Sequence, residues 1–288
     1  MTTPIAPRVH DLGNFEVRRA VPTLQLRSVG PFVFVDHMGP ALFQPGTGID
    51  VRPHPHIGLA TVTFLWSGRI RHRDTLGSDQ VIEPGAVNWM TAGRGIAHSE
   101  RTPEPPRASG HALHGMQTWV ALPKPHEDTA PAFHHHPAAT LPSIEHRGAR
   151  WRLIAGRAFG FESPVAVFGE IVNAALDLAA GAETRIDGAA AERALYILDG
   201  DARLDGRDVP ARHLLPLAPG SRPVLRAGAM PVKAMLFGGE PLDGPRHLWW
   251  NFVSSSTERI AQAKADWRAG RFGVIPGDAA EFIPLPEH

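Results

Sequence analysis

The chain has 288 residues, 43% hydrophobic and 20% charged, which is the composition of a globular protein with a sizeable core rather than of a disordered chain. Its 29 basic and 29 acidic residues cancel, so no long-range field would attract nucleic acid or an anionic membrane. Cysteine is absent, which excludes disulfides, thiolate zinc sites, iron–sulfur clusters and cysteine nucleophiles. Any bound metal must therefore be held by nitrogen and oxygen ligands.

The length and the turn content predict two domains built mainly from strands. At about 150 residues per domain, a chain of this length suggests about two domains. The 29 glycines and 28 prolines follow no short period, which is typical of many turns between short strands. The N-terminal segment 1–14 has no basic start followed by an apolar run, and no apolar run is long enough to span a membrane. We therefore expect a cytoplasmic protein.

Short runs of β-branched and aromatic residues, closed by turn residues, predict the strands. In the first half they lie at 32–35, 60–65 and 86–90, and the Pro-rich segment 123–142 is interpreted as the passage out of the first domain. The second half repeats the pattern at 165–168, 194–198, 213–217 and 232–237. A weak match between segments 64–68 and 196–200 indicates an internal duplication, and hence two similar barrels.

One helix is predicted near the C-terminus. Ser255 and Glu258 have the spacing of a capping box, and Gly270 supplies a left-handed stop. We expect this helix to pack its apolar face back on a barrel. That face consists of residues at helical spacing: Ile260, Ala263 and Trp267.

Histidine is concentrated in the first half, where 13 of the 16 histidines lie between His10 and His146. Within this region, His54 with His56 and His98 with Glu100 form two pairs of potential metal ligands spaced i, i+2. On a strand, both members of such a pair leave the same face, about 7 Å apart. Two such strands facing each other inside a barrel would bring three imidazoles and one carboxylate to one point. A mononuclear site of this type leaves one or two coordination positions open.

The spacing alone does not establish a metal site. A region this rich in histidine is expected to contain about one His-x-His pair by chance. A second pair does occur, at His134 and His136 in the Pro-rich segment, where the residues are interpreted as a surface strand. By spacing alone, His54 and His56 are equally compatible with metal ligands and with a solvated strand edge.

The residues around these pairs resemble the cupin superfamily and, within it, the pirin family. Segments 52–58 (RPHPHIG) and 89–100 (WMTAGRGIAHSE) are similar to the two pirin signatures. The resemblance covers most of the chain, including segments 32–40, 119–123 and 251–272. The glycines and histidines of the two general cupin motifs are matched by Gly48, His54, His56, Gly68, Gly95 and His98.

The resemblance implies an all-β bicupin fold with two β-barrel or jelly-roll domains. The domains would be an N-terminal metal-binding cupin at 1–135 and a C-terminal cupin without metal ligands at 136–245. A helix and tail at 246–288 would pack back on the barrels. Where the general cupin pattern has a glutamate, this chain has Ala60 and Thr61. In the second half, the positions equivalent to the two histidines of the His-x-His pair are occupied by Ile186 and Gly188. The metal ligands implied by the resemblance are His54, His56, His98 and Glu100.

The resemblance also implies a function. The metal would be Fe(II), with Mn, Co, Ni, Cu and Zn as alternatives that such ligands accept. Bacterial pirins are associated with quercetin 2,3-dioxygenase activity, in which a flavonol ring is opened by O2 and carbon monoxide is released. We therefore expect a monomeric enzyme that acts on a small flavonol-like substrate and O2, without nucleic acid or membrane partners. Glu100 would serve both as a ligand and as the general base.

Two other functions remain open at this stage. A pirin-like protein could be a non-catalytic, iron-dependent regulator that binds a transcription factor or a metabolic enzyme. A purely structural bicupin is disfavoured, because ligands are present in one barrel and absent from the other. Dinucleotide-binding, phosphate-loop and nucleophile-elbow motifs are missing from the sequence. Four further histidines could be hydrogen-bond donors to the site or ordinary polar residues: His37, His72, His111 and His114.

Overall fold

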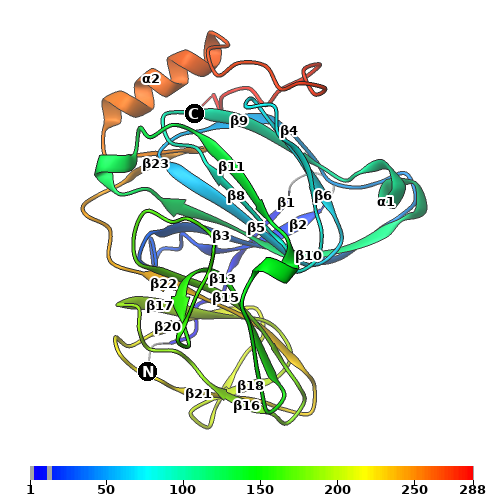
Figure 1. Cartoon of the computed structure of the whole chain (residues 1–288), viewed down its shortest axis with the longest axis vertical. Coiled ribbons are helices and arrows are strands. Elements are labelled where there is room, and N and C mark those ends of the chain that lie inside the picture. The colour runs from blue at the N-terminus through cyan, green and yellow to red at the C-terminus, as the bar shows by residue number, and fades with distance from the viewer. Residues whose placement is uncertain (1–2, 12–14, 288) are drawn as a thin grey trace. The chain divides into compact units, whose positions relative to one another are not determined.

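Strands account for most of the regular structure in the computed structural model, which describes residues 3–11 and 15–287 (Figure 1). The all-β fold predicted from the turn-rich sequence is therefore confirmed. In these ranges no helix is long and apolar enough to cross a membrane. The described residues do not include 1–2 and 12–14 of the N-terminal segment 1–14. They also do not include the last residue of the predicted tail at 246–288.

Internal contacts divide the chain into two compact units. The first, called here the histidine unit, comprises the described residues of 11–17, 38–138 and 242–288, and the second unit comprises those of 1–10, 18–37 and 139–241. Because both units draw on separate stretches of the chain, the sequential limits 1–135, 136–245 and 246–288 stay a prediction. Three strands have residues in both units: β1 (Arg8–Asp11), β2 (Glu16–Val21) and β3 (Phe32–Phe43).

Two antiparallel sheets form the histidine unit. One contains β10, β5, β8 and β11 in that order, and the other contains β4, β9, β6 and β7. The bounds are β4 (Asp50–His56), β5 (Leu59–Ser67), β6 (Ile70–Asp74), β7 (Asp79–Ile82), β8 (Val87–Thr91), β9 (Ile96–Arg101), α1 (Glu104–Ser109), β10 (His111–Ala121), β11 (Ala132–His136), β23 (His247–Trp249), β24 (Phe252–Ser254) and α2 (Thr257–Arg268), with a 3-10 turn at Lys124–His126.

The inner faces of these two sheets meet in an apolar core, in which Leu65 of β5 packs in one cluster with Ile70 of β6. Strand periodicity decides which residues enter it. In β6, Ile70, His72 and Asp74 are buried while the intervening residues are half-buried, because alternate side chains leave opposite faces of a strand. The same alternation that fills the core therefore carries polar side chains into the interior of the histidine unit.

The second unit repeats the two-sheet arrangement, with a core of buried, mainly aliphatic residues between sheets β12-β13-β15-β22-β17-β20 and β16-β21-β18-β19. A 3-10 turn spans Ala138–Thr140 at the change from one unit to the other. The bounds are β12 (Ser143–His146), β13 (Ala149–Ala158), β14 (Phe161–Glu162), β15 (Ile171–Leu178), β16 (Glu183–Arg185), β17 (Glu192–Asp199), β18 (Ala202–Leu204), β19 (Arg207–Val209), β20 (His213–Leu217), β21 (Val224–Ala227) and β22 (Val232–Gly239).

Six of the seven predicted strands are confirmed. Those at 32–35, 60–65, 194–198, 213–217 and 232–237 lie in β3, β5, β17, β20 and β22, and that at 86–90 overlaps β8. The strand predicted at 165–168 is wrong, because this segment is a loop between β14 and β15. Its start is held by Ser163, whose hydroxyl donates to the Ile154 carbonyl and accepts from the Val165 amide. Such local side-chain bonds compete with a strand ladder for the same backbone groups.

The predicted C-terminal helix is confirmed as α2, but its cap lies one residue later than the sequence indicated. The hydroxyl of Ser256, not Ser255, accepts from the Arg259 amide at 3.1 Å. Ser255 is occupied elsewhere, since its amide and hydroxyl both donate to the buried Glu127. Gly270 has the expected left-handed conformation, with φ +69°.

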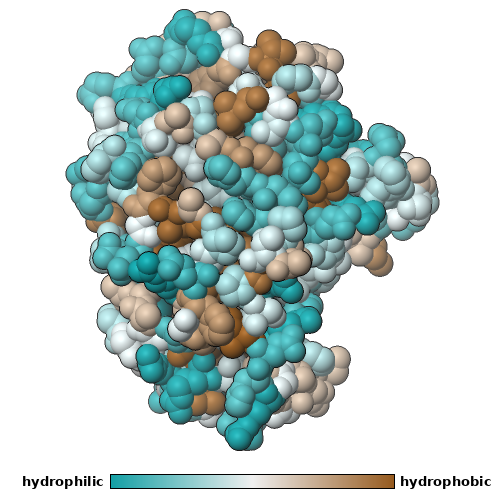
Figure 2. Space-filling model, viewed as in Figure 1, coloured by the Kyte–Doolittle hydropathy of each residue, from teal (hydrophilic) through white to brown (hydrophobic). Residues whose placement is uncertain are grey.

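Helix α2 places its apolar face on the histidine unit. Ile260 and Ala263 are buried in one cluster with Ile57 and Phe252, and Trp267 packs against that cluster. Figure 2 shows hydrophilic side chains over most of the visible face of the molecule, with apolar side chains in scattered patches. Among the described residues, most large hydrophobic side chains are buried.

Candidate metal centre

Three histidines converge in the interior of the histidine unit. Strands β4 and β9 pair antiparallel, with His54 directly opposite His98 and His56 two residues further along β4. One nitrogen from each ring lies within 4.8 Å of the others, and the ring centroids of His54 and His98 are 4.4 Å apart. The sequence pattern suggested two strands facing each other, whereas the structure places them side by side in one sheet. Opposed residues of neighbouring strands are close enough to share an ion.

Hydrogen bonds fix which nitrogen of each ring is free. Nδ1 of His54 lies 2.8 Å from the Arg52 carbonyl oxygen, and Nδ1 of His56 lies 3.2 Å from the Asn251 carbonyl oxygen. Because a carbonyl only accepts, both rings carry their proton on Nδ1 and keep the Nε2 lone pair available. The Nε2 atom of His98 is buried without a hydrogen-bond partner. Three available imidazole nitrogens at one point are a donor set that fits a divalent transition metal.

Burial keeps these rings in the state that binds a metal. The side chains of His54, His56 and His98 are almost fully removed from solvent. Burial lowers the pKa of His54, and burial with repulsion between the rings holds the pKa values of His56 and His98 well below their usual range. The three rings are therefore neutral near pH 7, as metal ligation requires.

Glu100 lies in the same interior but outside the group of three nitrogens. The Gln117 amide on β10 donates to both of its carboxylate oxygens at 2.8 Å, and the Thr63 hydroxyl on β5 donates to one at 3.4 Å. A bulge in β4 lies between Val51, which is opposite Glu100, and His54. This bulge interrupts the regular cross-strand spacing between Glu100 and the histidines. The role of Glu100 as fourth ligand stays a prediction.

Sequence reasoning missed two residues that contact a predicted ligand and a third that reaches one through His72. Gln117 and Thr63 are brought to Glu100 by the pairing of distant strands, for which no local pattern exists. Asp74 accepts from His72, which in turn lies against His98. The His-x-Asp spacing on β6 is the same i, i+2 signal that marked the ligand pairs, so it could have been found.

The structure separates the other histidines left open by the sequence. His72 contacts the site, whereas His37 lies against Tyr196 in the second unit, with its Nδ1 3.2 Å from the phenol oxygen. His111 stacks on Phe43. His114 lies beside Trp66 rather than among the ligands.

The histidine run in the Pro-rich segment forms a strand, as predicted. It lies in β11, which pairs with β8 at the end of the sheet order, with His134 exposed. Nδ1 of His135 donates to the side-chain oxygen of Asn88 at 2.8 Å. Trp89 and Met90 of β8 are buried core residues.

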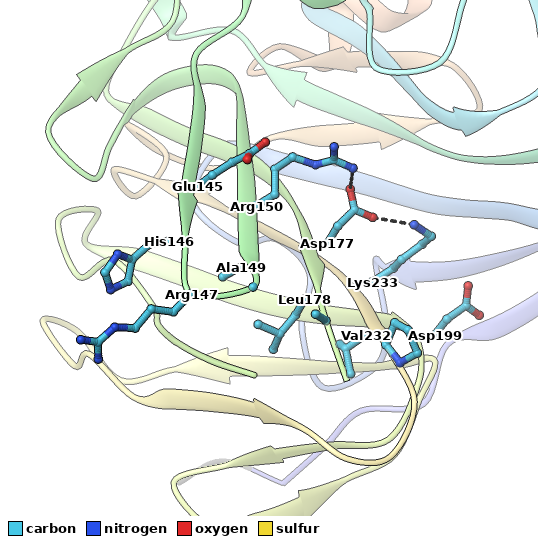
Figure 3. Close-up of a pocket in the computed structure, with 13 residues that line it drawn as sticks. Glu145, His146, Arg147, Ala149, Arg150, Asp177, Leu178, Asp199, Val232 and Lys233 are labelled. Carbon is cyan, nitrogen blue, oxygen red and sulfur yellow. Dashed lines mark hydrogen bonds and ion pairs between the residues drawn. The ribbon is translucent and has the colours of Figure 1, made fainter. Parts of the chain in front are cut away.

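The second unit has surface pockets lined by charged side chains. One of these pockets is shown in Figure 3, where Asp177 joins Arg150 at 3.1 Å and Lys233 at 2.5 Å. Ile186 is a buried core residue. The only group of three potential metal ligands found among the described residues is that of the histidine unit.

Comparisons with known proteins agree with this arrangement. The pirin family model matches residues 14–120, and the pirin C-terminal cupin domain model matches residues 173–273. A pirin-like protein of Caulobacter vibrioides is 51% identical over 283 residues, which cover 97% of either chain. A Pseudomonas aeruginosa protein named provisionally as a quercetin 2,3-dioxygenase is 39% identical over 282 residues, covering 95% of this chain and 87% of its own. The crystal structure of a quercetin 2,3-dioxygenase from Acinetobacter baumannii matches with a TM-score of 0.91 and 34% identity, covering 99% of this chain and 95% of that one.

Proposed function

Since the chain belongs to the pirin family of bicupin proteins, as its two signatures predicted, we propose that it is a metal-dependent dioxygenase that opens the ring of a flavonol such as quercetin. The observation that carries this proposal is the buried group of three neutral imidazoles. The substrate is supported by the names of the Pseudomonas and Acinetobacter relatives. A cytoplasmic location and a monomeric state remain predictions.

In this proposal His54, His56 and His98 hold the metal through Nε2, and Fe(II) is the metal that the resemblance favours. When bound, the metal would supply Lewis-acid and redox chemistry to a substrate oxygen and to O2. The ring of Trp119 lies 5.1 Å from that of His56, centroid to centroid, and adds an aromatic wall beside the ligands. An aromatic wall favours a flat, apolar substrate.

Glu100 is the proposed general base. Its carboxylate is buried and held by Gln117 and Thr63, so its orientation is fixed before a substrate binds. A carboxylate in that position can accept the proton that a flavonol hydroxyl loses on activation. Whether Glu100 also ligates the metal does not alter this role.

The test is the loss of quercetin absorbance under air with the Fe(II)-loaded protein. The His98→Ala variant removes one imidazole, and His134→Ala removes an exposed histidine as the matched control. We expect turnover by the wild type and the control, and at least about a hundredfold loss in His98→Ala. An iron-loaded wild type that leaves quercetin unchanged would refute the enzymatic proposal and favour a regulatory, partner-binding protein.

A further inference from the structure

A chain of buried polar side chains leads away from His98. Strand β6 pairs with β9 so that Asp74 lies opposite His98 and His72 lies opposite Glu100. Nδ1 of His98 is 3.3 Å from Nδ1 of His72, and Nε2 of His72 is 2.9 Å from Oδ2 of Asp74. Asp74 is 0% exposed and His72 is 4% exposed, so water does not compete for these bonds.

The protons in this chain have one consistent arrangement. Oδ1 of Asp74 accepts from the Leu76 and Ser78 amides, at 2.9 and 3.0 Å, which leaves Oδ2 to accept from His72. Burial raises the pKa of Asp74, but its hydrogen bonds from His72 and Ser78 outweigh this and lower the pKa, so it is an ionised acceptor.

The state of Asp74 determines the state of both rings. With its single proton on Nε2 facing Asp74, a neutral His72 presents an Nδ1 lone pair to His98. His98 then donates through Nδ1 and leaves its Nε2 lone pair available. Carbonyl oxygens impose this same tautomer on His54 and His56.

Packing holds the intermediate ring in place. Phe133 of β11 stacks on His72 with ring centroids 4.2 Å apart and planes inclined by only 10°. The ring plane of His72 is thus fixed independently of its hydrogen bonds. His98 is the one histidine of the three whose Nδ1 partner is another side chain rather than a backbone carbonyl.

We propose that Asp74 and His72 are positioning residues that set the tautomer of His98 and so present its Nε2 to the metal. The inference rests on the proposed metal site. Partners of ligating histidines commonly have this effect, and their loss typically lowers metal affinity by about 10- to 100-fold.

The sharpest test is Asp74→Asn, which keeps the side-chain shape. The new amide oxygen can still accept from the Leu76 and Ser78 amides, which turns the NH2 group towards His72. His72 must then carry its proton on Nδ1, and His98 is driven to carry its proton on Nε2, where it blocks ligation. We expect Zn(II) affinity, measured by competition with a chromogenic chelator, to fall by about 10- to 100-fold.

Two variants of His72 separate this effect from a general loss of structure. His72→Gln can donate its NH2 group to Asp74 and keeps a side-chain oxygen that can accept from His98. We therefore expect near wild-type Zn(II) affinity in His72→Gln. His72→Phe offers no acceptor to His98 and should lose affinity as Asp74→Asn does. A purely structural role of His72 would impair His72→Gln as much as His72→Phe.

Asp187→Asn is the matched control, because Asp187 also accepts from two backbone amides, those of Phe159 and Ala189, at a loop in the second unit. Thermal unfolding of each metal-free variant checks that it is folded. If folded Asp74→Asn and His72→Phe bind Zn(II) as tightly as the wild type, this inference is overturned. The proposed metal site would still stand in that case. A wild type that binds no Zn(II) or Fe(II) overturns the proposed function, and the inference with it.

Discussion

Each predicted site residue depends on its own neighbours for the chemistry proposed for it. Two imidazoles receive their tautomer from backbone carbonyls, and Glu100 receives its orientation from Gln117. The sequence predicted His54, His56 and His98 because their motifs are local. It could not predict Gln117 or Thr63, since strand pairing alone brings β10 and β5 to face β9.

Replacing Glu100 by Gln separates ligation from proton transfer. The amide cannot act as a base, but the three imidazoles remain, so we expect Fe(II) affinity within about tenfold of wild type and turnover reduced by about 100-fold or more. Iron content and the rate of quercetin loss are the two measurements. Full turnover by an iron-loaded Glu100→Gln protein would exclude the base role.

Strands and turns place these residues, and one turn is especially constrained. Gly58 joins β4 to β5 directly after the ligand strand, at φ +67°, and a Cβ there would come within 1.9 Å of the Val253 carbonyl oxygen. Only glycine meets both requirements. Local patterns identified most elements, but they failed at 165–168 and at Ser255. Ser163 binds the Val165 amide, and Glu127 binds the amide and hydroxyl of Ser255.

Gly58→Ala is therefore expected to destabilise the protein by about 3 kcal/mol, from backbone strain plus the clash with β24. Gly77→Ala is the control, because Gly77 has a similar φ of +88° but nothing within 4 Å of the added Cβ. We expect the control to lose only about 1 kcal/mol. Urea unfolding of both variants measures the difference, and equal losses would contradict the account of this turn.

The cross-strand ion pairs of the second unit make the stability of its sheet depend on pH. Burial raises the pKa of Asp177, but Lys233 of β22 and Arg150 of β13 outweigh it and lower the pKa below its ordinary value. A carboxyl whose pKa is lowered on folding adds stability above its unfolded pKa, near 3.9, and loses it as the pH falls through the folded value.

Asp177→Asn should accordingly cost stability at pH 7, by less than about 1 kcal/mol because the pairs are partly exposed. The difference from wild type should persist down to about pH 5 and shrink below about pH 4. Thermal unfolding across this range measures it. A difference that grows in acid would contradict the assigned sign.

At the scale of the whole molecule, both units consist of two packed sheets, but the group of three histidines lies in the histidine unit. The sequence predicted the family and the all-β fold from motifs and turns, and the comparisons confirm both. The division into units could not be predicted, because each unit combines segments that are distant in the sequence. Segment 18–37 belongs to the same unit as 139–241, and segment 242–288 belongs to the same unit as 38–138. The buried histidine group confines the proposed reaction to one unit.

The most direct test of the account is a reaction of the Fe(II)-loaded protein with quercetin under 18O2. A dioxygenase incorporates both atoms of O2 into product, so mass spectrometry should find two labelled oxygens per ring-opened molecule, with carbon monoxide released in equal amount. His98→Ala should form no labelled product. Quercetin loss without label, or labelled product undiminished in His98→Ala, would contradict a dioxygenase reaction at the histidine site.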